Sequence, residues 1–142
     1  MIQRLVNNIF TNVNIFVFLR RIIELDFYVL KKVIDTETKN LDNISRILDL
    51  GCGTGDFSPC FYNFHYTGID IEPEYIQYAK NKYNLDFRLM DGRILRFGEE
   101  TFDCIIIIGV LHHLCKKSCL EIFHELKRVV KPGGMVIIIE DV

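Results

Sequence analysis

Three glycines and an acid stand where two expected strands end, and residues of these types could hold a nucleoside. The run "ILDLGCGTG" places Gly51, Gly53 and Gly55 at alternate positions directly after an apolar stretch. Glycine permits φ > 0 in a tight turn, lets a ligand approach bare backbone, and exposes N–H groups at a helix start that suit a carboxylate or phosphate. Asp70 in "YTGIDI" could accept hydrogen bonds from both ribose hydroxyls. Together these residues predict a nucleoside site with an anionic group at the glycines.

Two histidines offer a second kind of chemistry. His112 and His113 follow the expected fourth strand, where an acceptor molecule would approach, and histidine can act as a base near neutral pH. The alternative is that one of them caps or packs the next helix. The run "HHLCKKSC" also adds Cys115 and Cys119, but no second Cys/His pair with zinc-site spacing exists elsewhere. We therefore expect no metal site.

Short apolar runs that alternate with helical segments must position these residues. We expect strands at 46–50, 66–70, 85–89, 102–108 and 135–140, and helices at 59–63, 73–83 and 118–130. Ser118 and Glu121 have the spacing of a capping box, which would open the last helix. The unalternating run "CIIIIG" predicts a strand covered on both faces, as in a parallel sheet. This order predicts a Rossmann-like α/β fold, doubly wound around a mostly parallel sheet, with ligands beyond the carboxyl ends of its strands.

The N-terminal residues have a different pattern. Apolar residues recur at spacings of three and four through residues 1–40, which predicts an amphipathic helical arm. Such an arm would pack on the domain or, alternatively, make a peripheral membrane contact through residues 1–34. Its longest apolar run, 15–19, is far shorter than the roughly 20 residues that a membrane span needs. Residues 36–43 are polar and suggest a linker.

The net charge bears on the kind of binding partner, and the cysteines bear on the redox compartment. The formal net charge is −2, which argues against a non-specific nucleic-acid binder, so we expect no nucleic-acid partner. The cysteine count of 5 is odd and the spacing irregular, which argues against a disulfide framework and predicts a cytoplasmic location.

Motifs in a fixed order also resemble a known family. "ILDLGCGTG", "TGIDI", "MDGRILRF", "FDCIIIIGVLHHL" and "LKRVVKPGGMVIIIE" resemble successive motifs of class I S-adenosylmethionine-dependent methyltransferases, over about residues 44–141. The resemblance implies S-adenosylmethionine as cofactor, S-adenosylhomocysteine as product, and methyl transfer to a small-molecule or lipid-like acceptor. An acceptor that carries a proton would benefit from a base.

The resemblance also implies cofactor contacts at the ends of four strands. The residues at the methionine part and the turn would be Asp49, Gly51, Gly53 and Gly55. Those around the adenosine would be Asp70, Ile71, Asp91 and Gly92, and Gly109 would lie near the sulfonium.

The chain departs from the family after the fifth strand, where seven-stranded members continue. We therefore expect an arm at 1–40 and a C-terminally incomplete methyltransferase domain at 44–142, with five strands of seven. The open edge of strand 135–140 would be a pairing site for a homodimer. Two other functions stay open: a non-catalytic S-adenosylmethionine-binding or scaffold domain, and an NAD-dependent dehydrogenase. The glycine spacing is one residue short of the dinucleotide pattern, which disfavours the dehydrogenase.

Overall fold

The computed structural model describes residues 28–140, which divide into two compact units between Lys39 and Asn40. In the first unit the described part is helix α3, Tyr28–Thr38. The helix continues into the expected linker as far as Thr38, and the hydroxyls of Thr36 and Thr38 donate to backbone carbonyls one turn earlier. The rest of the predicted arm lies outside the described residues, so the arm and its boundary stay predictions.

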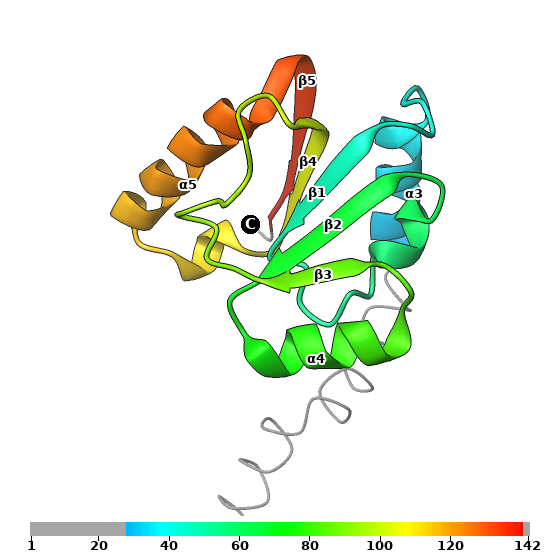
Figure 1. Ribbon diagram of the computed structural model, residues 1–142, viewed down its shortest axis with the longest axis horizontal. Coiled ribbons are helices and arrows are strands. Elements are labelled where there is room, and N and C mark those ends of the chain that lie inside the picture. Colours follow the sequence, from blue (N-terminus) through cyan, green and yellow to red (C-terminus); the bar gives the residue numbers. More distant parts are fainter. Residues whose placement is uncertain (1–27, 141–142) are drawn as a thin grey trace, which may run out of the picture. The chain divides into compact units, whose positions relative to one another are not determined.

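The second unit contains a sheet of five strands, all parallel, in the order β3-β2-β1-β4-β5 (Figure 1). The strands are β1 Arg46–Leu50, β2 His65–Asp70, β3 Asp86–Leu89, β4 Phe102–Ile108 and β5 Val130–Ile139. Strands β2 and β3 are added on one side of β1, and strands β4 and β5 are then added on the other side of β1. The sheet therefore has its topological switch point between β1 and β4, where open α/β sheets bind ligands.

Helix α5, Lys116–Val129, covers one face of this sheet. Its apolar residues recur at helical spacing, so Ile122, Leu126 and Val129 lie on one side of the helix. These side chains join a buried cluster with Leu48 and Ile105 from the two central strands. Three of the four isoleucines in β4, Ile105, Ile106 and Ile107, are completely buried, as the lack of alternation in this run predicts.

The opposite face carries helix α4, Pro73–Lys82, and a short 3-10 turn, η2, Ser58–Phe61. Three aromatic rings fill this layer: Phe61 stacks on Tyr66 and Tyr66 meets the edge of Phe87. With helices on both faces, the doubly wound Rossmann-like fold predicted from the sequence is confirmed.

Two boundaries differ from the sequence predictions. Helix α5 begins at Lys116 with Cys115 in extended backbone before it, so Ser118 lies inside the first turn and the expected capping box is absent. Strand β5 begins directly at Val130, and "KPGG" lies within it rather than before it. Gly133, at φ +77°, sits where the pairing of β5 with β4 shifts register between Phe102 and Cys104. A local bulge thus absorbs the residues expected to end the helix.

The expected helix at 59–63 is only the 3-10 turn η2. Within residues 28–140, no helix is both long enough and apolar enough to cross a membrane.

Candidate functional site at the carboxyl edge of the sheet

The expected site residues come from the carboxyl ends of four neighbouring strands. Asp49 lies near the end of β1 and pairs in register with Gly68 of β2. Asp70 is the last residue of β2, Asp91 follows β3, and Gly109 follows β4. Because the strands are parallel, all these ends lie at one edge of the sheet, beside the switch point.

The N–H groups of the glycine corner are already bonded. The Gly51 and Cys52 N–H groups both donate to the Ile69 carbonyl, at 2.8 and 2.9 Å, and the Gly55 N–H donates to the Cys52 carbonyl at 2.9 Å. The Gly53 N–H donates to Asp70 Oδ2 at 2.8 Å. No α-helix starts here either, since the chain enters the turn η2. The sequence interpretation of these groups as free anion donors at a helix start is therefore wrong.

Each glycine of the corner has positive φ, but only one faces open space. An added Cβ at Gly51 would overlap the Val110 side chain, and one at Gly55 would lie 3.0 Å from the Phe87 ring. An added Cβ at Gly53 would meet no atom within 4 Å. Gly51 and Gly55 thus allow the turn to pack closely, whereas Gly53 leaves open space beside its backbone that a ligand could approach.

Asp70 is held in a fixed orientation beside that open position. Its Oδ2 accepts from the Gly53 N–H and its Oδ1 accepts from the Glu72 N–H at 2.9 Å. A carboxylate has about four lone-pair sites, so two remain for a ribose diol. The neighbouring Ile71 is 65% exposed and offers an apolar surface to a flat ring. These features fit the adenosine part of S-adenosylmethionine.

Asp49 is buried, and its carboxylate accepts a hydrogen bond from the Tyr66 hydroxyl at 2.8 Å. Removal from water raises the pKa of Asp49 to about 7; the Tyr66 hydrogen bond lowers it in part, and the nearby charge of Asp70 raises it further. A substantial fraction of Asp49 is therefore protonated near neutral pH.

Asp91 lies in an ion pair instead of facing a free crevice. The Arg93 guanidinium donates from Nε to Oδ1 at 3.0 Å and from Nη2 to Oδ2 at 2.6 Å. The hydrogen bond from this side chain, together with the Arg93 N–H and charge, outweighs partial burial and holds the pKa of Asp91 below its usual value. An adenine amino group would have to share this carboxylate with Arg93. An added Cβ at the adjacent Gly92 would lie 3.1 Å from Leu50, so close packing also uses this glycine.

The two histidines lie in a 3-10 turn, η3, Leu111–His113, that follows Gly109. Their ring centroids are 3.9 Å apart. His112 Nδ1 lies 2.6 Å from a carboxylate oxygen of Glu140, the residue directly after β5. The sequence analysis did not identify Glu140. An acid at the carboxyl end of a strand, the feature that identified Asp70, was the available signal.

Cys115 and Cys119, which the sequence analysis considered as zinc ligands, contact other groups. Cys119 Sγ contacts the Leu111 carbonyl at 3.7 Å, and Cys115 Sγ lies 3.4 Å from the Ser118 hydroxyl. Among residues 28–140, no three His, Cys, Asp or Glu side chains are arranged to hold a metal ion. All five cysteines are free thiols, and the cytoplasmic location stays a prediction.

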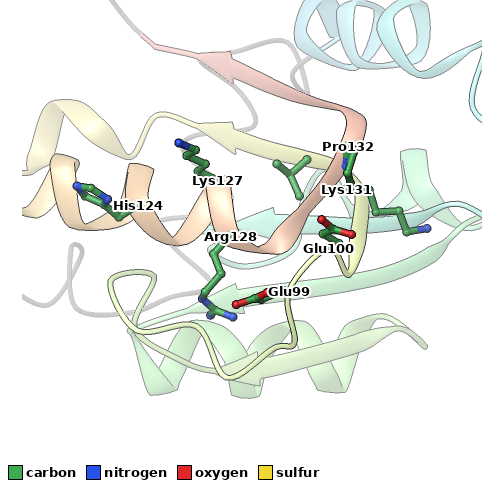
Figure 2. Close-up of a pocket in the computed structure, with 8 residues that line it drawn as sticks. Glu99, Glu100, His124, Lys127, Arg128, Lys131 and Pro132 are labelled. Atoms are coloured by element: carbon green, nitrogen blue, oxygen red, sulfur yellow. The ribbon is translucent and has the colours of Figure 1, made fainter.

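Two hollows lie at the opposite, amino edge of the sheet. One, of about 520 Å³, is lined by the first residues of three strands, Arg46, His65 and Asp86. The other, of about 500 Å³, lies between the end of α5 and the loop before β4; Figure 2 shows Arg128 and Lys127 on the helix and Glu99 on the loop. None of the expected site residues lines either hollow.

Comparison with known proteins identifies the family. Residues 47–134 match the family described as a methyltransferase domain. A probable tRNA methyltransferase 9B of Homo sapiens is 36% identical over 95 residues, which cover 66% of this chain and 21% of that protein. The tRNA (carboxymethyluridine(34)-5-O)-methyltransferase of Arabidopsis thaliana is 38% identical over 104 residues, which cover 70% and 25%. The chain therefore aligns with about a quarter or less of these relatives.

A solved structure of a methyltransferase has a similar fold. A SAM-dependent methyltransferase from Methanosarcina mazei superposes with a TM-score of 0.65 at 27% identity, covering 71% of this chain and 55% of that one.

These findings correct one expectation. One relative is named as a probable tRNA methyltransferase and the other as a tRNA methyltransferase, so the exclusion of a nucleic-acid partner is wrong. It rested on net charge, which bears on non-specific binding to a polyanion and not on a specific acceptor. The fold, the motif order and the comparisons together place this chain in the class I S-adenosylmethionine-dependent methyltransferase family.

Proposed function

We propose that this chain binds S-adenosylmethionine at the carboxyl edge of its sheet and directs the methyl group to a nucleoside of tRNA. The observation that carries the cofactor half is the Asp70 carboxylate, fixed by the Gly53 N–H beside open space. The acceptor half is supported by the tRNA methyltransferases among the relatives.

Binding and alignment are what the chain's own residues would contribute. S-adenosylmethionine supplies a methyl group already activated by a positive sulfur, so the protein mainly has to hold the acceptor close and in line. Asp70 would accept the ribose hydroxyls, Ile71 would pack on the adenine, and Asp91 would meet its amino group. Asp49, Gly51 and Gly53 would border the methionine part, with Gly55 shaping the turn. Gly109 would leave room at the sulfonium.

The two histidines would face the acceptor. The turn that carries them follows β4 at the same edge of the sheet, directly after Gly109. A histidine there could take a proton from the acceptor as the new bond forms.

The cofactor half is tested by calorimetry with S-adenosylhomocysteine. Asp70→Asn should weaken binding at least tenfold, because one lone-pair-rich oxygen and the negative charge at the ribose are both lost. Asp86→Asn makes the same chemical change at the amino edge of the sheet and should leave the affinity within twofold. Equal affinities in the two variants would refute the ribose role of Asp70. Binding of NAD in place of S-adenosylhomocysteine would instead favour the dehydrogenase.

The acceptor half is tested with S-adenosylmethionine carrying a labelled methyl group and unfractionated tRNA. Label should appear in one nucleoside after complete digestion, and Asp70→Asn should reduce its rate at least tenfold. Binding of S-adenosylhomocysteine with no label in any tRNA nucleoside would contradict this half and leave a non-catalytic cofactor-binding domain.

A further inference from the structure

Glu140 gathers an unusual set of donors at the carboxyl edge. Its Oε1 accepts the Val110 and Leu111 N–H groups at 3.0 and 2.8 Å. Its Oε2 accepts the His112 N–H at 3.2 Å and lies 2.6 Å from His112 Nδ1. One carboxylate therefore binds three successive backbone N–H groups and one imidazole ring, about thirty residues away in sequence.

These contacts keep Glu140 ionised. Partial burial acts to raise its pKa, but the Leu111 N–H, the His112 ring and the other two N–H groups together hold the pKa of Glu140 below its ordinary value. An ionised carboxylate has no proton to give, so the hydrogen at the 2.6 Å contact belongs to His112 Nδ1.

The second ring nitrogen of His112 is thereby left as an acceptor. A neutral imidazole carries one N–H, and here that hydrogen lies on Nδ1, so Nε2 presents a lone pair. Cε1, the ring atom between the two nitrogens, lies 3.6 Å from the position of an added Cβ at Gly109. The His112 side chain is 36% exposed, and within the described part of the chain no hydrogen bond is found at Nε2.

We propose that Glu140 is a positioning residue that holds His112 in the Nδ1–H tautomer, with Nε2 ready to take the proton of the methyl acceptor. The proton leaves the attacking atom of the acceptor for Nε2, and the electron pair of the broken bond stays on that atom. The imidazolium that forms is neutralised by the adjacent Glu140 carboxylate. The proposal rests on the proposed methyl transfer and specifies its acceptor as a hydroxyl or N–H group.

The same geometry separates the two histidines. The His113 ring lies close to that of His112, tilted by 53°, but it has no carboxylate contact among residues 28–140. The sequence placed both in one role, and the structure favours His112.

The direct test is the tautomer of His112, read from long-range proton–nitrogen NMR spectra of protein labelled with ¹⁵N-histidine. In the free protein, Nδ1 should carry the hydrogen and Nε2 should not. Glu140→Gln keeps an oxygen for the backbone N–H groups but removes the charge, and should produce a mixture of tautomers. A neutral His112 ring that carries its hydrogen on Nε2 in the unaltered protein would overturn the proposal, even if the variant failed to fold.

Kinetics with tRNA provide the second measurement. Glu140→Gln and His112→Gln should each lower kcat at least tenfold, leave the S-adenosylhomocysteine affinity within twofold, and lose no further activity when combined. Glu140→Asp should recover part of the loss. His124→Gln, on α5, is the matched histidine control and should leave kcat unchanged.

The two measurements separate this proposal from the proposed function. The NMR result needs neither cofactor nor acceptor, so the wrong tautomer refutes the positioning role alone. Unchanged kcat in Glu140→Gln also refutes it while methyl transfer stands. A protein with the expected tautomer that binds no S-adenosylhomocysteine would instead refute the proposed function.

Discussion

Asp49 is buried in the central strand with the Tyr66 hydroxyl as its partner, and loss of water raises its pKa to about 7. An unfolded aspartate has a pKa near 3.9. The folded state thus prefers the protonated form, so this group's contribution to stability is fully present below about pH 4 and is lost as pH rises to about 7.

Asp49→Asn removes this titration while keeping an oxygen for Tyr66. The free energy of unfolding of the variant, relative to the unaltered protein, should therefore increase by about 1 kcal/mol or more from pH 5 to pH 7, and level off above pH 7. Urea unfolding at several pH values measures this difference. The same difference at pH 5 and pH 8 would show that Asp49 is not protonated in the folded state.

At the residue scale, the sequence predicted which residues lie at the site better than it predicted which residues they contact. Asp70 and Gly53 were identified from type and spacing, and they lie in contact beside open space. Gly51 and Gly55 are glycine for reasons of packing against Val110 and Phe87, contacts that no local pattern reveals. Glu140 was missed because its partners lie in another loop, about thirty residues earlier.

Strand β2 is fitted closely against its neighbours at Gly68. An added Cβ there would lie 2.6 Å from the Tyr66 hydroxyl oxygen, 2.9 Å from the Phe87 ring and 3.0 Å from Cys52 Sγ. Gly68→Ala should lower the free energy of unfolding by about 1–3 kcal/mol, the usual cost of overpacking. Gly98→Ala is the matched control, since its added Cβ would meet only Thr101 Oγ1 at 3.5 Å. Chemical denaturation compares the two; equal stabilities would contradict the packing described for β2.

At the element scale, apolar runs predicted the strands because burial on both faces leaves a strong signal. Helix boundaries depend on single backbone angles and were predicted less well. Cys115 is extended, at φ −72° and ψ 157°, so α5 starts before Ser118 can cap it. The glycines of "KPGG" form a bulge within β5 because β4 is there to pair with, a partner far away in sequence.

Different ionisable residues lie at the two edges of the sheet. At the amino edge, Asp103 of β4 accepts the Arg46 N–H of β1 at 2.8 Å and the Lys131 ammonium of β5 at 2.7 Å. One carboxylate thus joins three strands, at the edge opposite to the expected cofactor-binding residues. Partial burial acts to raise its pKa, but these two donors outweigh it and lower the pKa of Asp103.

Asp103→Asn should therefore lower the free energy of unfolding by about 1 kcal/mol, the typical contribution of a hydrogen bond. It should leave the affinity for S-adenosylhomocysteine within twofold, the opposite of the result expected for Asp70→Asn. Unfolding and calorimetry on both variants test this division. A large loss of affinity in Asp103→Asn would show that the two edges are coupled.

The two backbone N–H groups that donate to the Asp70 carboxylate should affect how fast a ligand at this position exchanges. The Asp70 side chain loses rotational freedom when the chain folds. A nucleoside that binds as proposed would therefore meet an acceptor already oriented, and would avoid an ordering cost of about 0.5–1.5 kcal/mol. Affinity gained in this way would appear mainly as a lower dissociation rate of the ligand, and hardly at all as a higher association rate.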